Sequence, residues 1–206
     1  MDDHDLRETV TSRETLFEGK IITVEKWDVL LPNQRESGRE IVLHKGAAAI
    51  VPLDKNGYVT LVRQHRVAID RFTWEIPAGK LDFTGEDPFK CAQRELEEET
   101  GLQANKWQKL IQVVTTPGFC TETIAIYLAT ELSQTEAHTD ADEFLRIKKI
   151  PLGEAVSLVK QGKLEDMKTC LGLLLAQQAM GQPDFLVASS TLPPRPRQER
   201  FPGARS

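Results

Sequence analysis

The chain has 206 residues, a formal net charge of −5 at pH 7, 40% hydrophobic residues and 28% charged residues. These are the proportions of an ordinary globular protein, long enough for one domain with a good core and a small appended sheet. The acidic balance argues against a broad surface for nucleic acid or membrane. An enzyme of this composition that handles phosphates therefore needs a metal ion or local arginines.

The cysteines and the N-terminus point to a cytoplasmic location. Cys91, Cys120 and Cys170 are widely spaced and form no Cys-x-x-Cys or Cys/His cluster, so we expect reduced thiols in or near the core. The polar, acidic first residues do not resemble a signal peptide, and no apolar run reaches the length of a membrane span. No membrane partner is expected.

Residues 1–45 predict a small N-terminal sheet. After a loosely held polar start up to about residue 13, the β-rich run 15–31 predicts two short strands, and 39–44 predicts a third after a turn near Gly38. Such an antiparallel sheet is marginal by itself. We expect it to pack on its own domain or on a second subunit, as a dimerisation region.

Residues 46–181 alternate strands with helices. The runs 47–53 and 58–65 flank an Asp54–Gly57 turn, which predicts a hairpin that starts the main sheet. Further strands are expected at 74–76, 107–114, 123–129 and 144–149. Together with the helices described below, this order predicts an α/β sandwich with a mixed sheet.

Two helices and a tail complete the chain. Helical periodicity is found over 152–161 and 166–180, with Leu171, Leu174 and Leu175 as the predicted core stripe of the second helix. Residues 182–206 are rich in Pro and Arg, so we expect a disordered tail.

One acidic helix is predicted over Pro88–Thr100. Asp87 is a good N-cap, and Gly101 suits the position just after the C-terminus. Phe89, Ala92 and Leu96 fall on one apolar stripe at about 100° per residue. The glutamates are distributed around this stripe, with Glu95 and Glu99 beside it, Glu98 slightly further round and Glu97 opposite.

The glutamate spacing favours a positive partner at this helix. Like charges four residues apart cost about 0.2–0.5 kcal/mol per pair, and acidic groups near a helix C-terminus oppose its dipole. A hard divalent cation, which takes oxygen ligands, is the simplest partner for Glu95 and Glu99. The alternative is a solvated helix face on which Arg94 pairs locally.

The wider pattern resembles a known motif. Gly79, Glu86 and the run Arg94-Glu95-Leu96-x-Glu98-Glu99-x-Gly101-Leu102 closely resemble the Nudix hydrolase box. Six residues separate Gly79 from Glu86, one more than is usual in the family. The runs 61–66, 74–79 and 116–122 resemble the ADP-ribose pyrophosphatase group of that family, and the resemblance covers about residues 19–175.

The resemblance implies hydrolysis of ADP-ribose, a nucleotide sugar, to AMP and ribose 5-phosphate with Mg²⁺, Mn²⁺ being the alternative. It implies that Glu95 and Glu99 are the principal metal ligands, joined by Glu98 and the Ala78 carbonyl oxygen. Arg94 is expected to pair with a carboxylate of the box, with Glu86 as the candidate, and so to hold the loop on the helix.

For the reacting groups, the resemblance implies that Glu122 is the base that orients or deprotonates water; the alternative is a surface loop carboxylate. Arg66 is expected to clamp the diphosphate bidentately, with a strand-end salt bridge as the alternative and Arg63 as the substitute. Glu75 and Gly79, in the run 74–79, are further substrate-site candidates.

At the adenine end, the resemblance points to the N-terminal sheet of a second subunit in a homodimer. Ile21 is the candidate to stack on the base, while Arg39 and Glu40 approach its edge or the phosphates. Trp27 and Trp74 are alternative stacking residues for which packing is the favoured role. No role is assigned to His44.

Three rival functions remain open. A hydrolase of another nucleoside diphosphate sugar, such as GDP-mannose, would use the same catalytic residues. A nucleotide-sensing domain without activity is disfavoured because the box keeps every acidic residue, and no DNA-binding pattern accompanies it. A scaffold with an incidental acidic helix is the third reading.

Overall fold

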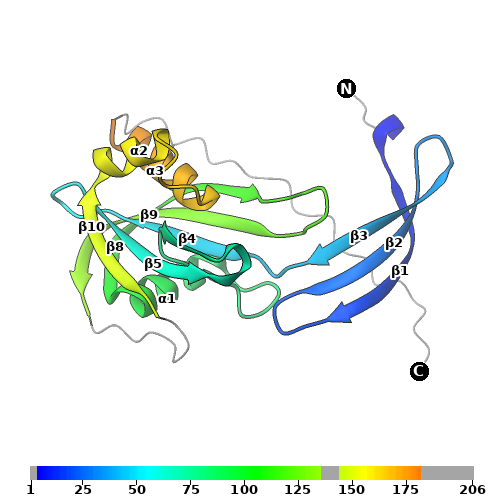
Figure 1. Cartoon of the computed structure of the whole chain (residues 1–206), viewed down its shortest axis with the longest axis horizontal. Coiled ribbons are helices and arrows are strands. Elements are labelled where there is room, and N and C mark those ends of the chain that lie inside the picture. The colour runs from blue at the N-terminus through cyan, green and yellow to red at the C-terminus, as the bar shows by residue number, and fades with distance from the viewer. Residues whose placement is uncertain (1–3, 136–143, 182–206) are drawn as a thin grey trace.

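The computed structural model describes residues 4–135 and 144–181. They form a sandwich of sheets and helices, and a separate three-stranded sheet projects from one end of it (Figure 1). This confirms the predicted mixed α/β fold with a small N-terminal sheet. The predicted disordered tail lies outside the described residues. Within the described ranges, no helix combines the length and apolarity needed to span a membrane.

The projecting sheet is antiparallel, in the order β1 (Thr9–Glu18), β2 (Thr23–Leu30) and β3 (Glu36–Leu43), after a short η1 (His4–Leu6). Two expectations were wrong here. The polar residues from Thr9 onward are not loosely held, because they pair with β2 as far as Leu30. Gly38, where a turn was expected, lies inside β3 and pairs with Asp28 of β2.

The body contains two sheets. In the first, the order is β7 (Ala78–Lys80), β4 (Ala47–Pro52), β9 (Thr123–Gln134) and β8 (Leu102–Val114). In the second, the order is β10 (Arg146–Pro151), β5 (Tyr58–Arg66) and β6 (Arg71–Glu75). The short 3-10 helix η2 (Val67–Ile69) connects β5 to β6. Among the strand pairs of the described residues, β4 with β9 is the parallel one. The short strand β7 was not among the strands expected from the sequence.

The predicted hairpin of β4 and β5 is largely absent. Its turn forms, since the Gly57 N–H donates to the Asp54 carbonyl at 3.0 Å and Gly57 has φ +80°. Beyond a single bridge from Leu53 to Val59, however, the strands separate into different sheets. β4 is almost fully buried and β5 is buried over residues 59–62, and each obtains its ladder from another partner: β4 from β9, and β5 from β10.

Helix α1 (Pro88–Thr100) has the predicted bounds and both predicted caps. The Phe89 N–H donates to Asp87 Oδ1 at 3.0 Å, and Gly101 adopts φ +64° and donates to the Glu97 carbonyl at 2.8 Å. Its buried Ala92 and Leu96 pack with Ala48 and Ile50 of β4. The opposite face of β4 carries α2 (Leu152–Lys160) and α3 (Met167–Gly181), as Figure 1 shows.

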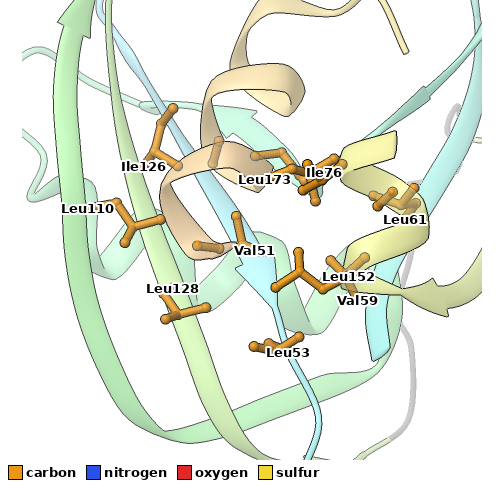
Figure 2. Packing of buried hydrophobic residues seen from close by; sticks show 14 of the residues in the cluster. Val51, Leu53, Val59, Leu61, Ile76, Leu110, Ile126, Leu128, Leu152 and Leu173 are labelled. Carbon is orange, nitrogen blue, oxygen red and sulfur yellow. The ribbon is translucent and has the colours of Figure 1, made fainter. Parts of the chain in front are cut away.

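The larger core lies between the two body sheets and these last two helices, around Val51, Ile76 and Leu173 (Figure 2). The predicted core stripe of α3 was wrong at Leu174 and missed Leu173. Leu173 is fully buried, while Leu174 is 40% exposed and Leu171 and Leu175 lie at the edge of the core. Gly172 explains the shift, because a Cβ there would lie 3.0 Å from Val51 and Ile76. Leu173 and the small residues Gly172, Ala176 and Ala179 form the buried face of α3.

Candidate active site

A cavity of about 930 Å³ opens beside α1. It brings together most of the predicted site residues. Its wall includes Glu95, Glu98 and Glu99 of α1, Ala78 and Gly79 of β7, Glu122 just before β9, Arg66 at the end of β5 and Ile21 of the β1–β2 turn. Residues that are far apart in the chain thus share one site.

The carboxylates of α1 are held against β7. Glu95 and Glu99 are only 7% and 3% exposed, and Glu99 Oε2 accepts the Ala78 N–H at 3.0 Å. A Cβ at position 79 would lie 1.9 Å from Glu95 Cδ, so only glycine permits this approach. The glycine that begins the motif is therefore explained by the close contact of the strand with the Glu95 carboxylate.

Arg94 pairs with carboxylates of its own helix. Its Nη1 donates to Glu95 Oε1 at 2.6 Å and to Glu98 Oε2 at 2.9 Å, and its Nη2 donates to the Lys80 carbonyl at 3.3 Å. Burial would lower the pKa of Arg94, but the neighbouring Glu95 and Glu98 raise it overall. The predicted pairing with Glu86 is absent, because Glu86 instead accepts the Asp82 N–H at 2.6 Å within the loop.

The donor set suits a divalent cation. Three carboxylates, two of them nearly buried, line one cavity, and carboxylate oxygens are ligands that Mg²⁺ and Ca²⁺ prefer. In the described ranges, no three acidic, His or Cys side chains already form a complete ligand group. The guanidinium of Arg94 occupies the space between Glu95 and Glu98, so a cation would have to compete with it.

Arg66 rests on a buried carboxylate. Its Nε and Nη2 donate to the two oxygens of Glu75, each at 2.7 Å, and Lys168 and Thr73 also donate to Glu75. Burial alone would raise the pKa of Glu75, but these partners lower it to about 2. In turn, the hydrogen bonds to Glu75 raise the pKa of Arg66. Glu75 is 2% exposed and lies behind Arg66, outside the cavity wall.

The start of α3 forms another part of the wall, which the sequence did not single out as a site. Asp166 caps the helix by accepting the Thr169 N–H at 2.9 Å, and it also accepts from Lys168 Nζ at 3.0 Å. The Thr169 hydroxyl accepts the Ile76 N–H at 2.9 Å, which ties α3 to the segment leading into β7. A lysine buried on the inner face of an otherwise apolar helix was the available signal.

Glu122 lines the same cavity as the α1 carboxylates, with His44 beside it. The His44 side chain is 10% exposed, and its Nδ1 lies 3.6 Å from Glu122 Oε1. The same Nδ1 accepts the Gly46 N–H at 3.0 Å, which fixes the orientation of the ring. Sequence reasoning assigned no role to His44, because nothing local indicates that it reaches residue 122.

The residues expected at the adenine end do not all line the cavity. Ile21 lines the cavity of its own chain, whereas Arg39 and Glu40 do not; Arg39 is paired with Glu8, its Nε donating to Oε2 at 3.0 Å. Trp27 packs under the guanidinium of Arg13 at 4.3 Å, and Trp74 packs against the core. The substitute Arg63 faces Phe72 at 5.2 Å and is also outside the wall.

The cysteines are free thiols, as expected. Cys91 is fully buried beneath the site, with Sγ 3.4 Å from the Lys80 carbonyl oxygen. Burial and the nearby Glu95 raise its pKa to about 12. It therefore packs as a thiol and offers no nucleophile to the cavity.

Comparisons with known proteins agree with this geometry. The family model described as the NUDIX domain matches residues 43–170. An ADP-ribose pyrophosphatase of Bacillus subtilis (strain 168) is 41% identical over 174 residues, covering 84% of this chain and 94% of the relative. An ADP-ribose pyrophosphatase of Mycobacterium tuberculosis (strain H37Rv) is also 41% identical, covering 84% of each chain. A solved structure described as an ADP compounds hydrolase superimposes with TM-score 0.75 at 24% identity, covering 85% of this chain and 96% of that one.

Proposed function

Because this chain belongs to the Nudix family of hydrolases, we propose that it hydrolyses the diphosphate of ADP-ribose to AMP and ribose 5-phosphate. The observation that carries the proposal is the single cavity that Glu95, Glu98 and Glu99 line together with Arg66 and Glu122. The oxygen of a water molecule forms a bond to one phosphorus, and the bridging P–O bond breaks. The substrate chemistry is supported by the names of relatives that are 41% identical to this chain.

Nudix hydrolases use divalent metal ions, and we propose Mg²⁺, with Mn²⁺ as the alternative, held by Glu95, Glu98, Glu99 and the Ala78 carbonyl oxygen. When bound there, the metal would neutralise the diphosphate charge and lower the pKa of the attacking water. Arg94 then serves to hold the Glu95 and Glu98 side chains in place. Gly79 leaves room for the Glu95 carboxylate, because a Cβ at this position would lie 1.9 Å from Glu95 Cδ.

Arg66 is proposed to bind the diphosphate. Its two hydrogen bonds to Glu75 use two of the five N–H donors of a guanidinium, which leaves three for phosphate oxygens. Glu75 thus acts through Arg66 by fixing its plane. The salt bridge expected as an alternative role for Arg66 is compatible with substrate binding.

Glu122 is proposed as the group that accepts a proton from the attacking water. It lines the cavity outside the α1 helix, and its side chain is 27% exposed. A base outside the metal-binding carboxylates keeps its lone pairs for the water.

Residues 1–45 are proposed as a dimerisation region, 46–181 as the hydrolase domain and 182–206 as a tail. Nine of the ten residues of β1 are exposed, including Leu16 at 54% and Phe17 at 56%. A sheet with so little cover calls for a second copy of the chain. In such a homodimer Arg39 and Glu40 would approach the partner's substrate, while Ile21 serves its own site. A cytoplasmic location is proposed from the three free thiols.

The experiment is hydrolysis of a panel containing ADP-ribose, GDP-mannose, UDP-glucose and NADH, with Mg²⁺ and with a chelator. Glu99→Gln is compared with the wild type, and Glu97→Gln is the matched control because Glu97 is absent from the cavity wall. We expect Mg²⁺-dependent release of AMP from ADP-ribose, lowered at least about 100-fold in Glu99→Gln alone.

Other outcomes separate the rivals. Faster cleavage of GDP-mannose would keep the catalytic residues and remove the adenine assignment. Binding of ADP-ribose without cleavage of any compound in the panel would favour the sensing domain. Equal rates with Mg²⁺ and with chelator would overturn the metal site.

A further inference from the structure

The loop that leads to Glu122 pairs with the end of the N-terminal sheet. Val42 of β3 forms a parallel bridge with Cys120. The Val42 N–H donates to the Phe119 carbonyl at 2.7 Å, and the Thr121 N–H donates to the Val42 carbonyl at 3.0 Å. Three consecutive loop residues before Glu122 therefore run alongside β3.

One side chain completes this pairing at the residue next to Glu122. The Thr121 hydroxyl accepts the His44 N–H at 2.9 Å and lies 3.3 Å from the His44 carbonyl oxygen, to which it donates. Both main-chain polar groups of His44 are thus satisfied by a single hydroxyl. Valine, which has the same shape, would leave both without this partner.

The same segment also limits the position of the Glu122 side chain. The His44 ring, held by the Gly46 N–H at Nδ1, lies 3.6 Å from Glu122 Oε1. This distance is a packing contact and not a hydrogen bond. On the other side of the chain, the Lys45 Nζ donates to the Asp82 carbonyl at 2.7 Å, and the Leu81 N–H donates to the Gly46 carbonyl at 3.0 Å. Residues 44–46 therefore connect two walls of the cavity.

We propose that Thr121 is a positioning residue for Glu122: its hydroxyl fixes the loop onto His44, and the His44 ring then confines the Glu122 carboxylate to the water-facing position. The inference rests on the proposed function of Glu122 as the proton acceptor. Because misplacing a reacting group by about 1 Å costs about 100-fold in rate, this anchor controls kcat more than substrate affinity.

The test is a kinetic comparison in the full-length protein, with ADP-ribose and Mg²⁺, of Thr121→Val and Thr121→Ser. Thr121→Val is expected to lower kcat about 10- to 100-fold with KM changed less than about threefold, and Thr121→Ser is expected to restore most of kcat. Thr60→Val is the matched control, since Thr60 Oγ1 is buried without a hydrogen-bond partner among the described residues. This control should keep the wild-type kcat.

A double-mutant cycle separates positioning from general damage to the fold. In a Glu122→Gln background, Thr121→Val is expected to lower kcat by less than about twofold, because no base remains to be misplaced. Wild-type kcat in Thr121→Val, an equal loss in both backgrounds, or a Thr121→Ser variant as slow as Thr121→Val would each overturn the proposal.

A readout that does not depend on activity keeps the two proposals distinguishable. Hydrogen exchange of the peptide covering residues 116–122 should be faster in Thr121→Val than in the wild type, and unchanged in Thr60→Val. If the wild type hydrolyses nothing, the proposed function fails; unchanged exchange in Thr121→Val would then overturn the anchor itself.

Discussion

At the scale of single residues, a few positions shape the cavity, and each of them has a different partner. Gly79 is needed because β7 lies against the Glu95 carboxylate. Glu75 is needed because the positively charged side chains of Arg66 and Lys168 both pair with it. Both lie in one short run, residues 74–79, but they act on different walls. Gly79 contacts α1, while Glu75 supports Arg66 and Lys168.

Gly79→Ala is expected to lower kcat for ADP-ribose at least about 10-fold while changing the free energy of unfolding little. The added Cβ would overlap the Glu95 carboxylate at 1.9 Å, and the flexible end of that side chain has to move away. Steady-state kinetics and urea unfolding measure the two effects. Gly153→Ala is the control, since a Cβ there meets nothing within 4 Å. A Gly79→Ala variant with wild-type kcat would refute the close contact.

The lowered pKa of Glu75 predicts that the stability of the fold depends on pH. Its pKa falls from 4.5 in the unfolded chain to about 2 in the folded protein, so its charged form stabilises the fold by about 3 kcal/mol above pH 5. That contribution is lost as the pH falls from about 5 to about 2. The difference in unfolding free energy between the wild type and Glu75→Gln should therefore shrink over this range.

The measurement is urea unfolding of both proteins at several pH values. Leu173→Ala is the control, because that substitution removes no titratable group and its effect on stability should not vary with pH. A difference between wild type and Glu75→Gln that stays constant from pH 7 to pH 2.5 would contradict the buried pairing of Glu75 with Arg66 and Lys168.

At the scale of elements, α1 and α3 differ in how well the sequence predicts their bounds and their buried faces. The bounds of α1 follow from its caps, and its glutamates follow from its periodicity. In α3 leucines and alanines occur around most of the helix, so periodicity alone does not select a buried face. Contact with β4 selects it, since Gly172 is the position at which the helix approaches Val51.

Leu173→Ala should lower the free energy of unfolding by about 2–5 kcal/mol, because a fully buried side chain leaves a cavity. Leu174→Ala, at 40% exposure, should lower it by less than about 1 kcal/mol. Chemical denaturation of the pair gives the comparison directly. Similar losses in both variants would restore the leucine stripe first expected for this helix.

At the scale of the whole molecule, the N-terminal sheet projects from the body and is attached to it through the end of β3 (Figure 1). Its β1–β2 turn places Ile21 at the cavity of the same chain. The sheet therefore contributes to the site, yet most of its outer strand has no cover within one chain. These features together support assembly through this sheet.

Leu16→Glu is expected to weaken a dimer by at least about 10-fold, because it replaces an exposed apolar side chain of β1 with a charged one. Sedimentation equilibrium over a range of concentrations measures the dissociation constant. Val67→Glu is the control, since Val67 is 83% exposed but lies outside the N-terminal sheet. A wild-type protein that is monomeric at every concentration, with full activity, would overturn the dimer.

Sequence by itself determined what depends on neighbours a few residues apart. The caps and bounds of α1, the order of strands and helices, and the box with Glu95 and Glu99 were all readable, because capping and side-chain spacing act within one or two turns. The mixed sandwich was also predicted, since alternation of strands and helices restricts the possible layers.

The tertiary structure alone decided which distant groups meet. The separation of β4 and β5 into two sheets, the buried face of α3, the pairing of Arg94 with Glu95 and Glu98, and the approach of His44 to Glu122 follow from packing between segments far apart in the chain. Strands choose partners, and buried charges choose counter-ions, by competition among all available neighbours. No local pattern records the result of that competition.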